Sequence, residues 1–352
     1  MASVGLELER HGSRRQQLVV VGLGILALSL ALAELALGPV KMSGAQLWGG
    51  LTGSGDFLDI NIIWQIRLPR LTLGIAVGMA LALAGTALQG MLRNPLADPG
   101  LIGITAGASI GAVSAIVLGR LIAPELPALL QTALLPLAAF VGATLVMACV
   151  FTLSRRGGET SVAMLILIGI AINTIAGALI GVLVYVADDQ ALRDLTFWSM
   201  GGLGHAGWPV VLMALGVALA MAPLFWRQAR GLDLFQLGER QAFHTGLNVE
   251  SSKRTLAFAA ALSVGAVTAA AGPIGFIGLV APHLARLLVG HAHRWVLPAS
   301  ALLGVSLVLA ADLTVRLAIA PQEPPIGIAT SLIGGPFFLW LLTRRLRSSS
   351  HA

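Results

Sequence analysis

Long apolar runs separated by short polar segments make up most of this chain. The runs fall roughly at residues 18–37, 68–92, 101–118, 129–153, 162–187, 208–226, 256–271, 274–289, 296–311 and 326–342. A helix needs about 20 apolar residues to cross the hydrocarbon core of a bilayer. The pattern therefore predicts an all-α integral membrane protein, a single transmembrane domain over residues 1–352, with ten membrane-spanning helices.

The seventh and eighth runs are short, and only Gly272-Pro273 separates them. One long bent helix over 256–289 would reduce the count to nine spans. Ten spans place sixteen of the 22 lysines and arginines on the side of both termini, which fits the positive-inside rule. Nine spans would put the arginine cluster at 344–347 on the opposite side. We therefore predict ten spans with both termini cytoplasmic.

Composition supports this class. The chain is 57% hydrophobic and 11% charged, and it holds 42 glycines, whereas a soluble domain carries about 25% charged residues. Glycine is frequent in membrane helices because small residues let two helix backbones approach closely. In such a protein, the net charge of +6 reflects arginines in cytoplasmic loops. We expect membrane lipid as the surroundings and no nucleic-acid partner.

One apolar stretch is interrupted in the middle, at Gly272-Pro273. A broken helix at membrane depth is tolerated only where it lines a cavity or is buried in protein, and in transporters it marks the pathway. We therefore expect this break to lie beside the translocation route. Four polar residues lie in or at the ends of apolar runs, and either a functional role or helix–helix hydrogen bonding would explain them: Glu34, Gln89, Asn173 and Asp312.

The polar segment 227–254 differs in character from the other loops. Gly238 and Gly246 frame a short helix of about two turns, in which apolar side chains recur among charged ones: Leu234, Leu237, Ala242 and Phe243. Such a helix lies on lipid headgroups in one interpretation. In the other it docks its apolar side chains into the groove of a cytoplasmic partner. The residues alone leave both open.

Signals of catalysis are missing. A phosphate-binding P-loop needs Gly-Lys followed by Ser or Thr, but Met42 follows Lys41 and Arg254 follows Lys253. If ATP drives this protein, a different polypeptide hydrolyses it. His291 and His293 lack the Cys or acidic neighbours that a metal site needs. We predict a protein that is no enzyme and binds no metal or cofactor of its own.

Several motifs, in one order along the chain, resemble the FecCD-type permeases, the membrane subunits of bacterial ABC importers for haem, ferric siderophores and cobalamin. The resemblance covers about residues 60–342 and rests on these motifs: Arg67-Leu-Pro-Arg70, Gly85-x-x-x-Gln89, Asn94-Pro-Leu-Ala97-x-Pro99, Gly103-x-x-x-Gly107-Ala108, Phe197-Trp198-x-x-Gly201, Leu237-Gly238 with Gly246, Gly272-Pro-Ile-x-Phe-Ile-Gly-Leu-Val-x-Pro282-His283, Arg286, Ala311-Asp312, Arg316, Glu323-x-Pro325-x-Gly327 and Gly335-Pro336-Phe337.

The resemblance implies a type II ABC importer permease of the bacterial inner membrane. Such a ten-helix protomer forms a homodimer with the pathway between its two copies. Two ATPase subunits, which hold ATP and Mg²⁺, dock on the cytoplasmic side, and a periplasmic solute-binding protein docks outside. The family's roles fall on these positions: docking of the binding protein on Arg67, Arg70 and Arg316; ATPase coupling on Leu237, Gly238, Glu239, Ala242, Phe243 and Gly246; and the cytoplasmic gate on Asn94, Pro95, Leu96, Thr160 and Ser161.

The substrate depends on finer likenesses. Residues 192–201 are most similar to the corresponding segment of haem permeases, so we expect haem before a siderophore and cobalamin third. His205 and Tyr185 lie near the predicted outer mouth, where a haem would pass. The rival of another class is a secondary transporter driven by an ion gradient. It would need carboxylates in mid-span, but Glu34 and Asp312 fall near span ends. A purely structural membrane protein is a third alternative, but it would need neither the break at Gly272-Pro273 nor the polar turn at residues 93–100.

Overall fold

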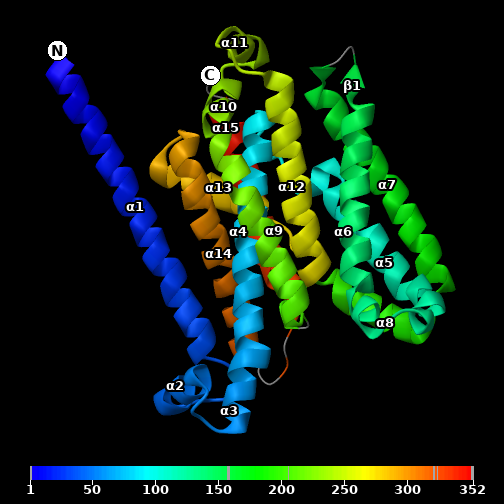
Figure 1. Cartoon of the computed structure of the whole chain (residues 1–352). Helices are drawn as coiled ribbons and strands as arrows, with labels where there is room; N and C mark the ends of the chain where they lie inside the picture. Colours follow the sequence, from blue (N-terminus) through cyan, green and yellow to red (C-terminus); the bar gives the residue numbers. More distant parts are fainter. Residues whose placement is uncertain (1, 157–158, 205, 320–321, 323, 350–352) are drawn as a thin grey trace.

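A computed structural model of the chain describes residues 2–349 apart from 157–158, 205, 320–321 and 323 (Figure 1). The α-helices are α1 (Ala2–Ala36), α2 (Gly44–Thr52), α3 (Phe57–Asn61), α4 (Leu68–Met91), α5 (Ile104–Ile122), α6 (Ala128–Leu153), α7 (Val162–Val186), α8 (Asp189–Ser199), α9 (Trp208–Arg227), α10 (Ala229–Phe235), α11 (Glu239–His244), α12 (Val249–Ala271), α13 (Ile277–Val289), α14 (His293–Ala318) and α15 (Ile326–Ser349). A π-helix, η1 (Ile62–Arg67), leads into α4, and the 3₁₀ turns η2 (Pro99–Ile102) and η3 (Ala123–Glu125) flank α5. Strands β1 (Arg155–Arg156) and β2 (Glu159–Thr160) form an antiparallel hairpin.

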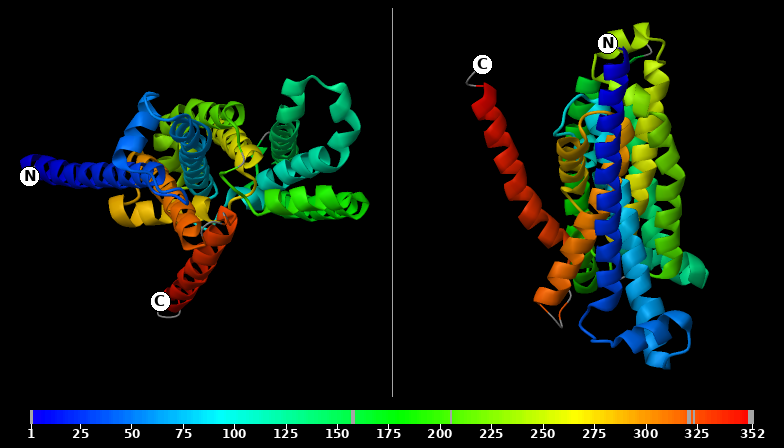
Figure 2. Two further views of the ribbon diagram at one scale, coloured as in Figure 1. Left: turned by 90° about the horizontal axis from the view of Figure 1, so that it is seen from below. Right: turned by 90° about the vertical axis from the view of Figure 1, so that its left-hand side faces the viewer.

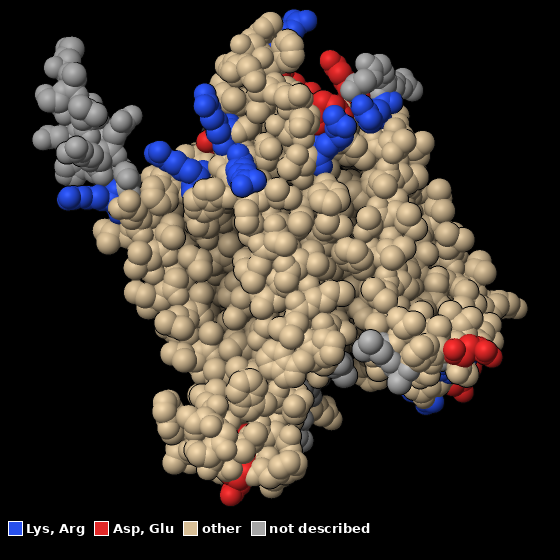
Figure 3. Space-filling view, viewed as in Figure 1, with Lys and Arg blue, Asp and Glu red and all other residues tan. Residues whose placement is uncertain are grey.

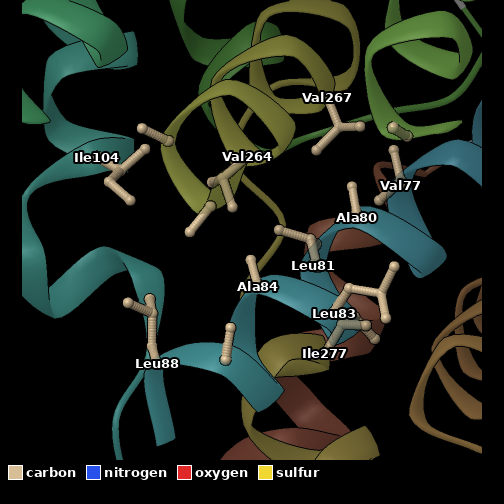
Figure 4. Close-up of a cluster of buried hydrophobic side chains, with 14 of the residues drawn as sticks. Val77, Ala80, Leu81, Leu83, Ala84, Leu88, Ile104, Val264, Val267 and Ile277 are labelled. Carbon is tan, nitrogen blue, oxygen red and sulfur yellow. The ribbon is translucent and has the colours of Figure 1, made fainter. Parts of the chain in front are cut away.

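Helix α4 lies at the centre of the bundle and packs against α9, α12, α13 and α14. Small residues allow this close packing. A Cβ atom added to Gly78 of α4 would lie 2.5 Å from the carbonyl oxygen of Gly304 in α14, which is closer than real contacts allow. The side chains around α4 form a continuous apolar core with α5, α12 and α13, part of which Figure 4 shows.

The outer helices leave much of their surface uncovered. Helices α5, α6 and α7 pack together on one side of the bundle, and α1 lies along α14 at the opposite edge. Helix α15 contacts α13 and α14 and leans away from the rest (Figure 2). Apolar side chains are exposed along α1, α7 and α15. This is the surface of a protein whose surroundings are apolar.

The apolar runs form helices as predicted, but not all of them are long enough to span. Within the described residues, eight helices are long and apolar enough to cross a membrane, and Ile277–Val289 and Ile326–Trp340 are shorter apolar helices. The 13 residues of α13 rise only about 20 Å, against a hydrocarbon core of about 30 Å. The ten-span count therefore stays a prediction. Helix α12 also begins earlier than the predicted run, at Val249, because its first turns are polar.

The two ends of the bundle differ in charge and in the elements they carry. Both chain ends lie at the end that carries α10, α11 and the β-hairpin, while α2, α3 and α8 lie at the other (Figure 1). Lysine and arginine side chains gather over the α11 end on the face seen in Figure 3, and the flank below it is uncharged. An even number of crossings explains why the chain begins and finishes on one side. We call these the α11 end and the α8 end.

Candidate functional site

The segment 227–254 folds into α10 and α11 and projects from the α11 end. Gly238 precedes α11 with φ of 103° and Gly246 follows it with φ of 86°. L residues rarely adopt these conformations, so the two glycines set the bounds of the short helix, as predicted. Leu237 and Phe243 are 64% and 68% exposed, and they point apolar surface away from the bundle.

Not every predicted coupling residue lies on that exposed surface. Ala242 is fully buried and packs toward the bundle. Glu239, the first residue of α11, reaches back to α12, where its carboxylate accepts a hydrogen bond from Lys253 Nζ at 2.6 Å. Within the predicted set, Leu237 and Phe243 therefore form the exposed apolar surface, while Glu239 and Ala242 hold the loop in place.

Lys253 joins α11, which carries predicted coupling residues, to the predicted gate. Its side chain is 1% exposed, and Nζ donates a second hydrogen bond to the backbone oxygen of Thr160 at 2.8 Å. The Thr160 amide and hydroxyl in turn donate to the Glu250 carboxylate at 3.1 and 2.7 Å. A buried ammonium group is stable only when it is paired. One charged network thus connects α11, the first turn of α12 and strand β2.

Glu250 and Lys253 are site residues that the motifs did not predict. The signal was present, because they form a Glu-x-x-Lys pair on one face of the first turn after a loop, in a chain that has only two lysines. Their partner Thr160 precedes Ser161, whose hydroxyl caps the start of α7 by accepting from the Met164 amide at 3.5 Å. The network therefore holds the first turn of α7.

The second predicted gate segment is a tight turn after α4. Asn94 Oδ1 accepts from the Leu96 amide at 3.0 Å, and the Asn94 carbonyl accepts from the Ala97 amide at 3.0 Å. Pro95 lies between them at the edge of a cavity. The side chains of Asn94, Pro95 and Leu96 are half-buried. The turn is rigid, and Leu96 stays the predicted constriction.

Asp98 continues this turn into η2. Its Oδ1 accepts from the Gly100 amide at 2.8 Å, while burial raises the pKa of the Asp98 carboxyl above its ordinary value. Asn173 of α7 donates to the Gly100 carbonyl at 3.0 Å. Turn η2, which follows the Asn94–Leu96 turn, thus contacts α7 at Asn173, about three turns after the first residue of that helix.

The predicted helix break is present between α12 and α13. Gly272 has φ of 71°, and a Cβ atom there would lie 2.3 Å from the Trp198 carbonyl oxygen at the end of α8. Phe276 adopts φ of 68°, which is rare for a bulky residue. Gly334 of α15 packs against the Phe276 ring. A Cβ atom added to Gly334 would lie only 2.2 Å from Phe276 Cγ. The break is therefore held between α8 and α15.

A hollow of about 400 Å³ lies beside this break. Pro273 and Gly275 from the break, Ser199 from α8, and Gly327 and Ser331 from α15 line it. These residues are small, and the rest of the lining is apolar. Irregular backbone of this kind does not face lipid. The hollow is the part of the structure that best fits a solvent-lined route.

The three predicted docking arginines lie at the α8 end, but all three are buried. Arg70 holds Asp312 with two hydrogen bonds, from Nε at 2.7 Å and from Nη2 at 2.9 Å. Arg316 pairs with Glu34, and Arg67 donates to the backbone carbonyl groups at the end of α1. The arginines therefore tie α4 to α14 and α1 in this conformation. To contact a second protein as predicted, Arg70 and Arg316 would have to exchange their present carboxylate partners for carboxylates of that protein.

The two acidic candidates for ion coupling are thus the partners of arginines. Glu34 and Asp312 are each 2% exposed, and each lies within an ion pair that joins helices. The Arg70–Asp312 pair lines a small cavity of about 100 Å³ together with Phe197. A carboxylate already neutralised by a guanidinium group does not suit reversible ion binding in mid-span.

Helix α8, which holds most of the predicted substrate-discriminating segment 192–201, lies at the α8 end. Asp188 caps it by accepting from the Ala191 amide at 2.7 Å, and this bond together with the nearby Arg120 lowers the pKa of the Asp188 carboxyl. Tyr185 is 90% exposed beside it, whereas His205 lies outside the described residues. No three His, Cys, Asp or Glu side chains gather as metal ligands in the described part of the chain.

Comparison with known proteins adds independent information. The model of the FecCD transport family matches residues 24–344. The hemin transport system permease protein HmuU of Yersinia pestis is 44% identical over 340 residues, which cover 97% of this chain and 99% of that protein. The cobalamin import system permease protein BtuC of Halobacterium salinarum is 40% identical over 81% of this chain and 74% of its own length. The vitamin B12 import system permease protein BtuC of Vibrio cholerae is 35% identical over 96% of this chain and 97% of that protein.

A solved structure shares the fold. It is an inward-facing conformation of a metal-chelate type ABC transporter, with a TM-score of 0.82 and 31% sequence identity. The match covers 93% of this chain and 99% of that one. The overall arrangement of helices therefore has a structural counterpart.

Proposed function

Because this chain belongs to the FecCD transport family and is an ABC transporter permease, we propose that it forms the membrane pathway of a bacterial importer for haem. It is a multi-pass transport subunit, and it works in an ABC transporter complex. ATP with Mg²⁺ is hydrolysed on two separate ATPase subunits, and a periplasmic binding protein delivers the substrate. The chain itself binds no cofactor.

The observation that carries the choice of haem is the 44% identity with a hemin permease across 97% of the chain. The cobalamin permeases match at 40% and 35% identity, so cobalamin is the alternative. A ferric siderophore has the same requirement for a wide, mostly apolar route. The small residues around the break suit any of these bulky solutes.

The Lys253 network supports coupling to ATP hydrolysis. Exposed Leu237 and Phe243 offer apolar side chains to a groove on an ATPase subunit, and such anchors are the usual means by which a short helix docks. A shift of α11 would pass through Glu239 and Lys253 to Thr160, because their contacts are direct. The gate segment would then move with the loop.

The face that carries the break supports a homodimer. The backbone groups of Pro273 and Gly275 border an open hollow, and hydrocarbon would leave such groups without hydrogen-bonding partners. A second copy facing this surface would cover it and enclose a route between the two protomers. The exposed apolar side chains of α7 and α15 would supply the contact around that route.

We place the α11 end in the cytoplasm and the protein in the inner membrane. The accumulation of lysine and arginine at the α11 end supports this orientation, and it puts both chain ends inside. The ion-gradient alternative is dropped, because the family is one of ABC permeases and because Glu34 and Asp312 are committed to arginines.

Transport by the whole complex tests this function. The chain is co-expressed with an ATPase and a binding protein of the same source, and the permease–ATPase complex is reconstituted into proteoliposomes that enclose apomyoglobin. Binding protein loaded with haemin is added outside, and the haem absorbance of the enclosed protein is followed. We expect an increase that requires both ATP and the binding protein.

Parallel assays with a ferric siderophore and with cyanocobalamin separate the candidates. If cobalamin is taken up and haemin is not, cobalamin is the substrate and the proposal of haem is wrong. Haemin uptake that does not require ATP but is abolished by an ionophore would reject the ABC mechanism. Proteoliposomes supplied with a non-hydrolysable ATP analogue serve as the control, because the complex still assembles in them.

A further inference from the structure

A basic cavity of about 300 Å³ lies at the α11 end, away from the helix break. The end of α4, the end of α10, α13 and the start of α14 surround it. Five of its lining side chains carry or can accept a positive charge: Arg93, His283, Arg286, His291 and His293. Among the described residues that line it there is no Asp or Glu. A cavity with this lining attracts an anion.

Arg93 is held at the edge of this cavity by an unfavourable backbone. It follows α4 with φ of 50°, and the amides of Arg93 and Asn94 donate to the Gly90 and Gln89 carbonyls at 3.3 and 3.1 Å. This is a Schellman motif, whose left-handed position is normally occupied by glycine. Within the described part of the chain, the Arg93 guanidinium has no hydrogen-bond or ion-pair partner. An arginine kept at such a position points to a use for its side chain.

His293 supplies a second, independent observation. Asp233 accepts hydrogen bonds from its backbone amide at 2.9 Å and contacts Nδ1 at 2.7 Å. This contact fixes the ring, and the opposite nitrogen, Nε2, is buried without a hydrogen-bond partner among the described residues. Buried polar atoms are normally satisfied. Because the Asp233 carboxylate takes the proton on Nδ1, Nε2 can donate to an anion in the cavity when the ring carries both protons, and such an anion would supply the missing partner.

The cavity lies where the charged end meets the apolar flank. Leu287 of α13 lines the cavity and is 62% exposed, and the neighbouring Leu288 is 41% exposed. Arg294 stacks over the Trp295 ring at 5.8 Å at the start of α14, and tryptophan is typical of the membrane interface. In the proposed orientation the cavity would lie at headgroup level, beside exposed apolar side chains.

We propose that this cavity binds the phosphate group of an anionic phospholipid from the leaflet on the α11 side. Arg93, Arg286 and His291 would surround the phosphate oxygens, and the first acyl-chain carbons would lie along Leu287. Arginine suits a phosphate because its planar group donates two parallel hydrogen bonds. An inorganic phosphate ion shares the headgroup chemistry but lacks the contact with Leu287.

Binding of brominated lipids to the purified full-length permease tests the proposal. Quenching of tryptophan fluorescence is measured in nanodiscs of phosphatidylcholine that contain small amounts of brominated phosphatidylglycerol. We expect Arg93→Gly to lose about fivefold in apparent affinity, the effect of one arginine near a charged headgroup. Because glycine suits the left-handed backbone, this variant should fold at least as well as the parent. Arg93→Lys should retain most of the preference.

Two controls give the result its meaning. Arg230→Gln removes an exposed arginine of α10 that does not line the cavity, and it should leave the lipid preference unchanged. Leu287→Ser should weaken lipid binding but not the binding of inorganic phosphate.

If millimolar phosphate displaces the lipid completely and Leu287→Ser has no effect, the site is one for free phosphate and the lipid is rejected. Equal quenching in Arg93→Gly and Arg230→Gln would overturn the site altogether. Loss of ATPase binding in Arg93→Gly with an unchanged lipid preference would assign the cavity to an acidic side chain of that partner.

Discussion

Lys253 donates a hydrogen bond from its buried ammonium group to the backbone oxygen of Thr160 at 2.8 Å. The two residues are 93 positions apart in the chain, and one belongs to the helix that follows the coupling loop while the other precedes α7. The same ammonium group binds Glu239 at the start of α11. This relationship gives the loop a direct mechanical connection to the first turn of a helix beside the predicted gate.

We expect Lys253→Met to uncouple transport from ATP hydrolysis. Methionine keeps most of the side-chain volume but removes the donor to Thr160 and the partner of Glu239. Coupling between sites is typically worth a factor of about 5–150, so the amount of substrate moved per ATP hydrolysed should fall at least about fivefold. The measurement is the ratio of the two rates in proteoliposomes.

Arg254→Gln is the matched control for this variant, because Arg254 is adjacent and has no hydrogen-bond or ion-pair partner within the described residues. It should keep the ratio of the parent. If Lys253→Met also keeps that ratio while folding normally, the network serves only the stability of the loop.

The sequence was enough to predict the helices of the apolar runs, the break at Gly272-Pro273 and the glycine-bounded helix α11, but not the short helices α2, α3, α8 and α10. The predicted features depend on local physics: hydrophobic length, proline and left-handed glycine. The pairings of Lys253 with Thr160 and of Arg70 with Asp312 were missed. They join residues 93 and 242 positions apart, and no local signal states which buried charge meets which. The length of α13 was also overestimated, because its apolar run includes the broken backbone before Ile277.

Exposed Leu237 and Phe243 should anchor an ATPase subunit. Replacing either by Asp puts a charge on an apolar contact, and burying it without a partner is costly. Since both side chains are already in solvent in the free permease, the variants should fold normally. We expect the ATPase to be lost when the tagged permease is purified.

Ala242 provides the contrast within the same helix. Its side chain is fully buried, so Ala242→Asp should lower the thermal stability of the permease itself, whether or not the ATPase is present. Co-purification of a normal amount of ATPase with Phe243→Asp and Leu237→Asp would mean that α11 is only a surface helix on the membrane.

Breaking the Arg70–Asp312 pair should have opposite effects on the stability of the permease and on the docking of the binding protein. Asp312→Asn removes a buried charge and leaves the Arg70 guanidinium without its carboxylate, which costs about 3–5 kcal/mol in buried pairs. The free permease should therefore unfold at a lower temperature in detergent. If Arg70 docks the binding protein, the same change should strengthen that complex, because an incoming carboxylate no longer competes with Asp312.

Surface-immobilised permease and soluble binding protein give the affinity for this test, with unfolding followed in parallel. Charge reversal in the Arg67→Glu, Arg70→Glu double variant should abolish docking, but its loss of stability has to be measured as well. An Asp312→Asn permease that loses stability and affinity together would make the pair purely structural.

Orientation is tested by labelling single cysteines in a Cys149→Ala background. Cys149 is the only cysteine and is exposed, so it must be removed first. A cysteine at exposed Gln190, in the first turn of α8, should react with an impermeant maleimide in intact spheroplasts. A cysteine at exposed Arg240, in α11, should react only after lysis. The reverse pattern would invert the protein and place α11 outside, away from any ATPase.

The helix break should depend on a contact between Gly334 and Phe276. Phe276 adopts a left-handed backbone conformation at the start of α13, and its ring fills the space beside Gly334 in α15. A Cβ atom at Gly334 would lie 2.2 Å from Phe276 Cγ, so Gly334→Ala must displace either the ring or the whole of α15. Overpacking of this kind costs about 1–3 kcal/mol. We expect a lower unfolding temperature and slower transport, because α15 lines the hollow beside the break.

The neighbouring Gly335 is the control, since a Cβ atom there meets nothing within 4 Å. Gly335→Ala should be neutral or stabilise the helix by up to about 1 kcal/mol. If both alanine variants transport at the rate of the parent, the packing of α15 on the break does not set the conformation of the pathway.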